Sequence, residues 1–454
     1  MCTIDNGSSR VETLESRRLM AGVTMLVHGD GANIDGWVTA SAEAIAQRIR
    51  GSSSTYVMTL GQNHKERLAV TSMRLCSGPP LNRNTSGEAI IKLDWGAAAG
   101  GRYSDKQISN VLASYLTKPH GSMRRLAELP MHFIGQSRGA AIVSALSRNL
   151  GRRGIGVDQV TYLDPHPVDG HGDAKGTDFG DGPVRIYDNV AFADNYWRSD
   201  GNPHNDSPDG QPVQGAHEAD LNRIMQADSG GSAHVAVTAY YHGTIDTRAM
   251  SDGEQPISAL WYGDNAQTPA REQTGFIFSR LGGGTRPADG VAQSLGGAGA
   301  RARAGKQGPQ WPNLINPSVI GGAMLPIGPR ATLRFTYDDR DSSQHITVFL
   351  DRDTNPYNGN TLQVLRQLTA KPAPALVGAR VSIPTDRIAA GTYFIGVQTS
   401  DRRGHLRIEY SPLLSFEPQP PKTTAAALPP FSTVPISSGS ESPTRKRVRN
   451  TLVT

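Results

Sequence analysis

The most informative stretch of the chain is Met131-His-Phe-Ile-Gly-Gln-Ser-Arg-Gly-Ala-Ala-Ile-Val143. Residues 131–135 are a short, mostly apolar run typical of a buried strand, and residues 140–150 have the composition of a helix. Between them stands Gly135-Gln-Ser-Arg-Gly139, in which small residues flank a serine. A strand, a tight glycine-flanked turn and a helix are the context of a nucleophile elbow, which presents the serine oxygen at the carboxyl end of a sheet. Ser137 is therefore the candidate nucleophile.

Strand-like and helix-like segments alternate on both sides of this turn, from residue 22 to about residue 250. The expected strands are 22–27, 55–60, 89–94, 131–135, 159–163 and 185–192, and the expected helices are 39–50, 107–116 and 140–150. This alternation predicts a mostly parallel sheet with helices on both faces. The sequence thus predicts an α/β domain over residues 22–250.

The rest of the chain changes in character. Residues 251–325 are less regular and include a Gly-rich stretch, so we expect an extension and linker. Residues 326–416 alternate apolar and polar side chains in short runs without helices, which predicts a β-sandwich-like accessory domain. Residues 417–454 are rich in Pro, Ser, Thr and basic residues, and this composition predicts a disordered basic tail. Residues 1–21 are interpreted as a leader.

A serine hydroxyl needs a base, and the base needs an acid that orients it. Asp164 ends the expected strand 159–163, at the sheet edge where the serine also lies. Asp194, after the next strand, is the alternative acid. Both positions stay open on the residues alone.

The candidate base is His234, because a Gly-Ser loop precedes it and helix-competent residues follow it. A histidine in this position is able to swing over the sheet edge. His242 is the main alternative base, and His217 and His166 are further alternatives. The order Ser, Asp, His along the chain favours His234.

The tetrahedral intermediate of acyl transfer needs two N–H donors for its oxyanion. One donor is expected to be the backbone N–H of Arg138, directly after the nucleophile. The other is expected from the loop His28-Gly-Asp-Gly31 after the first strand, with the Asp30 N–H favoured.

From about Thr24 to Ile245 the chain resembles the α/β-hydrolases, in particular the pancreatic-lipase-like group. The residues that carry this resemblance are Thr24-Met-Leu-Val-His-Gly-Asp30, Lys92-Leu-Asp-Trp-Gly96 with Tyr103 and Asn110, Tyr162-Leu-Asp-Pro165, and His234 with Tyr240 and Tyr241. The resemblance implies an α/β-hydrolase fold, an ester or lipid-like substrate and the triad Ser137, Asp164 and His234. It departs from the group at Gln136, where histidine is usual, and at Arg138, where a small or apolar residue is common. It identifies no lid, although residues 166–183 or 197–230 are candidates.

Composition excludes several other classes of protein. The net charge of +5 is concentrated in part in the tail 445–449, without the aromatic or motif support of a nucleic-acid site. Two cysteines, Cys2 and Cys76, give neither a disulfide framework nor a metal cluster. No stretch has the roughly 18 apolar residues of a membrane span. We therefore expect no nucleic-acid partner, no transmembrane span and no cofactor.

Two short patterns remain. The segment Leu14-Glu-Ser-Arg-Arg-Leu19 resembles a bacterial export-associated motif, which implies an extracellular or cell-surface protein, with a cytoplasmic one as the alternative. Asp351, Asp353 and Asn355 place oxygen ligands at alternate positions, as calcium loops do. The loop lacks the terminal glutamate of an EF-hand, so a turn between strands is the favoured interpretation and no metal is expected.

The sequence therefore predicts a serine-dependent carboxylic-ester hydrolase that works through an acyl-enzyme. An acyltransferase, thioesterase or amidase with the same triad is an alternative, because one fold and triad serve all these reactions. A surface adhesion or binding protein with an inactive hydrolase domain is another.

Overall fold

The computed structural model describes residues 22–49, 53–81, 87–99, 103–168, 178–199, 210–222, 224–225, 233–263, 268–291, 301–305, 311–328, 330–339, 342–354, 356 and 361–418. The predicted leader and nearly all of the predicted tail lie outside these residues. Within them, no helix is both long enough and apolar enough to cross a lipid bilayer.

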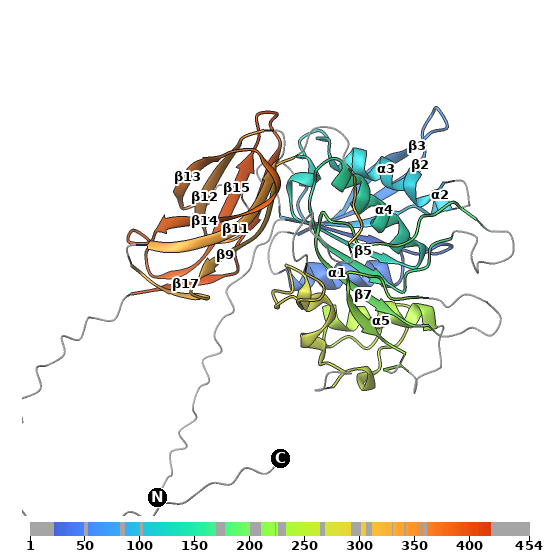
Figure 1. The fold of residues 1–454 in the computed structure, drawn as a ribbon. Coiled ribbons are helices and arrows are strands. Elements are labelled where there is room, and N and C mark those ends of the chain that lie inside the picture. Colours follow the sequence, from blue (N-terminus) through green and yellow to red (C-terminus); the bar gives the residue numbers. More distant parts are fainter. Residues whose placement is uncertain are drawn as a thin grey trace, which may run out of the picture.

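The first part of the molecule is built on an eight-stranded sheet in the order β3-β2-β4-β1-β5-β6-β7-β8 (Figure 1). Its strands are β1 (Gly22–Val27), β2 (Ser53–Gln62), β3 (Leu68–Ser77), β4 (Glu88–Asp94), β5 (Met131–Gln136), β6 (Val157–Leu163), β7 (Val190–Trp197) and β8 (His217–Asp220). Strand β3 pairs antiparallel with β2, and the other pairings are parallel. The predicted mostly parallel sheet is thus confirmed.

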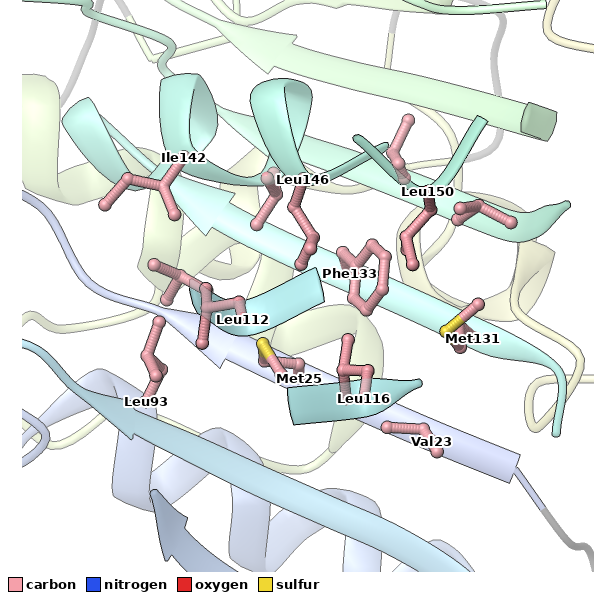
Figure 2. Close-up of a cluster of buried hydrophobic side chains, with 14 of the residues drawn as sticks. Val23, Met25, Leu93, Leu112, Leu116, Met131, Phe133, Ile142, Leu146 and Leu150 are labelled. Atoms are coloured by element: carbon pink, nitrogen blue, oxygen red, sulfur yellow. The ribbon is translucent and has the colours of Figure 1, made fainter. Parts of the chain in front are cut away.

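Helices cover both faces of this sheet. They are α1 (Trp37–Arg48), α2 (Gly96–Ala99), α3 (Asp105–Leu116), α4 (Arg138–Arg152) and α5 (Ala233–Ile245), with short 3-10 turns η1 (Leu126–Glu128), η2 (Ala259–Trp261), η3 (Arg271–Gln273) and η4 (Gly275–Phe278). Successive strand residues point to opposite faces, so Phe133 packs against α3 and α4 whereas Ile134 packs against α1 and α5. Figure 2 shows the first of these cores, between the sheet and the leucines of α3 and α4.

The second part, the β-region (residues 313–417), consists of two sheets around one apolar core. Its strands are β9 (Asn313–Ile320), β10 (Met324–Pro326), β11 (Arg330–Asp339), β12 (Gln344–Asp351), β13 (Gln363–Ala370), β14 (Ala373–Pro384), β15 (Gly391–Ser400), β16 (Leu406–Tyr410) and β17 (Leu414–Glu417). The region begins with β9, before the expected boundary at residue 326. Leu314 and Val319 of β9 are buried in its core, and β9 pairs with β11, so this strand belongs to the β-region rather than to a linker.

The β-region contacts the sheet at the amino ends of its parallel strands. The buried Arg407 of β16 donates hydrogen bonds to the carbonyls of Ala127, Leu129 and Gly156, which precede β5 and β6. Asn313 accepts a hydrogen bond from the Gly156 N–H at 2.7 Å. The opposite, carboxyl ends of β1, β5 and β6 carry the candidate site, so the contacts with the β-region and the candidate site lie at opposite edges of one sheet.

Candidate active site

Ser137 stands in the sharp turn between β5 and α4. Its backbone has φ 55° and ψ −126°, a combination that residues other than glycine rarely adopt and that is typical of strained functional turns. The two flanking glycines are needed for space: a Cβ on Gly135 would lie 2.5 Å from the Gly139 carbonyl oxygen, and one on Gly139 would collide with the backbone at Val27. The serine side chain therefore projects from the carboxyl edge of the sheet, as the sequence predicted.

Asp164 and His234 are in direct contact. Asp164 follows β6 with φ 49°, and its side chain is fully buried. Its Oδ2 lies 2.5 Å from Nδ1 of His234, and its Oδ1 accepts the N–H of Arg198 at 2.7 Å. Gly210 lies so close to Oδ1 that a Cβ there would collide with the carboxylate. The carboxylate is thus fixed by a strand end, a backbone N–H and a close backbone approach.

His234 lies in the first turn of α5 and also contacts Gln136, the residue before the serine. Its Nε2 is 3.0 Å from the Gln136 side-chain nitrogen. If Nδ1 carries the hydrogen that it donates to Asp164, then Nε2 accepts a hydrogen bond from the Gln136 amide. This tautomer has its lone pair directed at the elbow, where a base for Ser137 would need it.

The loop after β1 lies against the turn that contains Ser137. A Cβ on Gly29 would lie 2.8 Å from Cβ of Ser137 and 2.5 Å from the Gln136 side-chain oxygen, so only glycine fits there. Asp30 follows directly, and Arg138 begins α4, whose first N–H groups have no acceptor within the helix. Both expected oxyanion donors therefore belong to segments that border Ser137.

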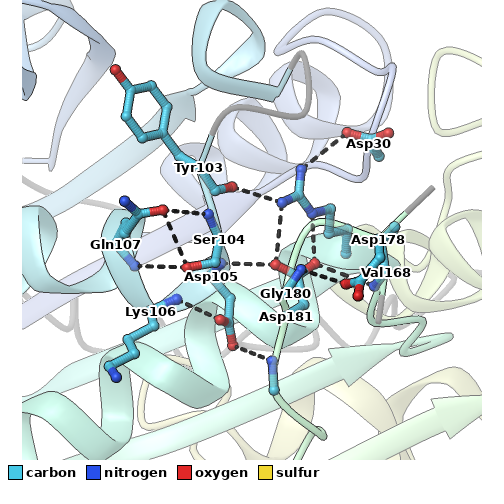
Figure 3. A network of polar contacts seen from close by, with 12 residues as sticks. Asp30, Tyr103, Ser104, Asp105, Lys106, Gln107, Val168, Asp178, Gly180 and Asp181 are labelled. Atoms are coloured by element: carbon cyan, nitrogen blue, oxygen red, sulfur yellow. Dashed lines mark hydrogen bonds and ion pairs between the residues drawn. The ribbon is translucent and has the colours of Figure 1, made fainter. Parts of the chain in front are cut away.

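The side chain of Arg138 has a role that the sequence did not predict. Its guanidinium is fully buried and donates to both oxygens of Asp181, at 2.6 and 3.1 Å, and to the carbonyl of Tyr103 at 2.8 Å. It also lies 3.3 Å from Oδ1 of Asp30 (Figure 3). The guanidinium of Arg138 thus links three segments through its contacts: the loop after β1, the start of α3 and the segment around Asp181.

Two aromatic rings complete this arrangement around the buried arginine. The guanidinium lies over the rings of Trp95 and Phe179, with 5.3 and 4.1 Å to their centroids. Trp95 also donates to the His28 carbonyl at 3.0 Å and stacks on the His28 ring. Burial lowers the pKa of His28, which favours the neutral form of this imidazole behind the loop that carries Asp30.

The alternative acid lies elsewhere. Asp194 is buried within β7, where it accepts hydrogen bonds from Gln159, Thr161 and the Tyr196 hydroxyl. Burial raises the pKa of Asp194 to about 6. Its described partners include no histidine hydrogen-bonded to it, so the structure brings Asp164, rather than Asp194, together with His234.

The alternative bases are also separated from the elbow or differently engaged. His242 is buried two turns along α5 with its Nδ1 3.0 Å from the Ser41 hydroxyl, and burial lowers the pKa of His242. His217 contacts Asp289 at 3.0 Å on the surface. The ring of His166 lies 6.4 Å from the His234 ring, and the backbone N–H of His166 donates to the backbone carbonyl of Ser137.

The calcium candidate is only partly described. Asp351 is buried, and the Tyr410 hydroxyl donates to its Oδ2 at 3.2 Å, while its Oδ1 accepts the N–H of Arg352. Asp353 is also buried, and Asn355 lies outside the described residues. Among the described residues, no group of three or more His, Cys, Asp or Glu side chains is arranged to hold a metal ion.

Comparisons with known proteins do not assign this chain to a family. No family model and no curated protein matches the chain. Among solved structures, the wild-type OgpA of Akkermansia muciniphila is similar at 8% identity over 90% of this chain and 97% of that one, with a TM-score of 0.18. The PKD domain of an M14-like peptidase from a Thermoplasmatales archaeon matches at 18% identity over 24% of this chain and 92% of that domain, with a TM-score of 0.14.

A further match is the alkylpurine DNA glycosylase AlkC of Pseudomonas fluorescens, at 13% identity and a TM-score of 0.18. It covers 23% of this chain, which in turn spans 30% of the glycosylase. Similarities at these TM-scores support no conclusion about fold or function, so the function is argued from the site itself.

Sequence reasoning missed three contributors to this site. Gln136 was noted only as a departure from a family pattern, and Asp181 and Gly210 were not noted at all. A signal existed for Arg138, because a charge directly after a nucleophile, at the start of a buried helix, requires a buried counter-charge. No local pattern marks Asp181 or Gly210, since their contacts join segments distant in sequence.

Proposed function

We propose that the protein is a serine-dependent hydrolase of carboxylic esters. The observation that carries the proposal is the contact of 2.5 Å between Asp164 and His234, whose Nε2 lies 3.0 Å from the side chain of Gln136, the residue before a serine in a positive-φ turn. A strand-turn-helix serine, an aspartate after the next strand and a histidine in the expected chain order support a Ser-His-Asp triad. The same features, with the strand order of the sheet, support membership of the α/β-hydrolases and a likeness to their pancreatic-lipase-like group.

The reaction would proceed through an acyl-enzyme. Ser137 Oγ attacks the acyl carbon while its proton moves to Nε2 of His234, and Asp164 stabilises the imidazolium. The N–H groups of Asp30 and Arg138 stabilise the oxyanion until the alcohol leaves with the proton from His234. Water then attacks the acyl carbon and gives its proton to His234, which passes it to Ser137 Oγ as the acyl–oxygen bond breaks and the acid leaves.

Gln136 adds a condition to the first step. Its amide occupies the Nε2 lone pair that must receive the serine proton, at 3.0 Å. The Gln136 side chain therefore has to release His234 when substrate binds. No cofactor enters this mechanism, and the leader motif supports a location outside the cell or at its surface.

The test is turnover of p-nitrophenyl esters of graded acyl length by the wild type and by Ser137→Ala. We expect the variant to lose at least about a thousandfold in kcat/KM, because only binding and oxyanion stabilisation remain. Ser147→Ala is the matched control, since Ser147 lies in α4, the helix that follows Ser137, and its hydroxyl bonds only the Val143 carbonyl among the described residues. It should retain wild-type activity.

Each other result would point to one of the alternative functions. If the protein hydrolyses thioesters or amides but not esters, the proposed substrate bond is wrong and the proposed triad stands. Equal activity in wild type and Ser137→Ala, or none in either on all three bond types, would refute the proposal and favour a binding protein.

A further inference from the structure

A hollow lies on the surface of the α/β part, and Ser137 is not among the residues that line it. Its volume is about 460 Å³, and it lies between the start of α3, the outer face of α4, residues 180–187 and the short segment around Ala302. The residues that line it include none of the candidate triad, so it is not part of the site described above.

The hollow is lined by an excess of positive charge. Five basic side chains border it: Lys106, Arg148, Arg152, Arg185 and Arg303. All are at least partly accessible to solvent, and within the described residues none of them forms an ion pair. Such a concentration of unneutralised charge in a concave surface attracts anions more strongly than the same charges spread over a flat surface.

Asp105 is the single acidic residue that lines the hollow, so it offsets at most one of the five positive charges. Its two oxygens accept the backbone N–H groups of Lys106 and Gly182 (Figure 3). Burial raises the pKa of Asp105 to about 6. The Asp105 carboxylate is thus hydrogen-bonded to the backbone at the start of α3 and at Gly182, and not to the arginines that line the hollow.

The floor of the hollow is a fixed structure. The Ser144 hydroxyl donates to the Arg185 carbonyl and accepts the Arg185 N–H, each at 3.0 Å. Asn149 donates to Ser109 at 2.7 Å, and the Arg148 guanidinium lies 6.0 Å from the Tyr187 ring centroid. The backbones that carry the basic side chains are therefore held in place before any ligand arrives, which lowers the entropy cost of binding.

We propose that this hollow binds a small polyanion with phosphate or carboxylate groups. Guanidinium groups present parallel N–H donors that match the oxygens of both groups. The volume suits a small molecule, and the charges surround a concavity instead of following a stripe, which favours a compact ligand over a nucleic-acid strand.

The test uses the full chain and isothermal titration calorimetry at about 50 mM salt, where screening is weaker than at physiological ionic strength. Inorganic pyrophosphate and citrate are the two probes, and they separate a phosphate from a carboxylate ligand. We expect one binding site per chain for at least one probe. Arg148→Gln with Arg185→Gln should weaken that binding by about tenfold per arginine, the loss typical of a charge-assisted hydrogen bond.

The control is Arg366→Gln with Arg380→Gln, which removes the same charge from exposed positions of the β-region. It should bind as the wild type does. If the Arg148/Arg185 variant fails to fold, Lys106→Gln with Arg303→Gln tests the same hollow. The absence of binding for both probes, or an equal loss in the control, would overturn the proposal.

Discussion

The two edges of the eight-stranded sheet carry similar polar groups with different surroundings. At the carboxyl edge, buried Asp164 contacts His234 at 2.5 Å and buried Arg138 pairs with Asp181. At the amino edge, where the β-region docks, buried Asp401 contacts His405 at 2.7 Å and Arg407 pairs with Glu409. An aspartate–histidine pair and a buried, ion-paired arginine are thus present at both of these edges.

The difference lies in what each histidine faces. His234 faces a turn in which Ser137 has φ 55° and glycines make room for the backbone. His405 stacks on Trp311 with 4.6 Å between ring centroids, and its aspartate also accepts the N–H groups of Arg403 and His405. A carboxylate–imidazole contact therefore points to catalysis only when the imidazole also faces a group that could react. Without such a group, as at His405, we interpret the contact as one that holds the β-region against the sheet.

The largest expected effect comes from exchanging the two aspartates for asparagine. Asp164→Asn should lower kcat for ester hydrolysis about 10⁴-fold, because asparagine cannot stabilise the imidazolium and favours the wrong tautomer. Asparagine tolerates the positive φ at this position, so the variant should still fold. Asp401→Asn is the matched variant at the amino edge, and its kcat should stay within about twofold of wild type.

Parallel kcat measurements and thermal unfolding of both variants check this contrast. A large loss of activity in folded Asp401→Asn, or a small loss in Asp164→Asn, would show that the two pairs have been assigned the wrong roles.

Next in size is the loss of the buried arginine at the amino edge. Arg407→Met removes the donors to the carbonyls of Ala127, Leu129 and Gly156 and leaves Glu409 buried without its cation. We expect a loss of about 4 kcal/mol in the free energy of unfolding, as for other broken buried ion pairs. Urea unfolding measures it.

Arg402→Met serves as the control for this change, since Arg402 is exposed on the turn beside Arg407. It should shift the free energy of unfolding by no more than about 0.5 kcal/mol. A similar shift in both variants would mean that Arg407 does not hold the β-region to the sheet. The kcat of Arg407→Met below its unfolding transition should remain near that of wild type.

The carboxyl edge was more predictable from sequence than the amino edge, for a physical reason. Ser137, Asp164 and His234 each stand at the end of an element whose periodicity is local, so their positions could be predicted once the elements were assigned. The docking of Arg407 and Asn313 depends on segments far apart in the chain, and no local pattern encodes it. The antiparallel β3 and the strand β8 were missed, because half-exposed strands carry many polar residues.

Strand boundaries shifted for a related reason. The sequence predicted a strand at 185–192, whereas β7 spans Val190–Trp197. Arg185 and Tyr187 belong to an irregular segment that packs beside α4, and Asp194 and Asn195 lie inside the strand despite their polarity. Their hydrogen bonds to neighbouring segments are what permit polar residues in a buried strand.

The smallest effect concerns Asp194, which lies inside the sheet between the two edges. Burial raises its pKa from an ordinary 3.8 to about 6, so the folded state binds the Asp194 proton more tightly than the unfolded state does. Its contribution to stability is fully present below about pH 4 and is lost as the pH rises through 6. The loss is about 3 kcal/mol, from two pKa units at 1.36 kcal/mol each.

Asp194→Asn mimics the protonated carboxyl and should remove this dependence. Between pH 4 and pH 7, the free energy of unfolding of the variant should therefore rise by about 3 kcal/mol relative to wild type. Urea unfolding at both pH values measures the difference, and kcat should stay within about tenfold because Asp194 does not contact His234. A parallel pH dependence in both proteins would show that Asp194 titrates normally. A loss of activity as large as that of Asp164→Asn would instead make it the acid of the triad.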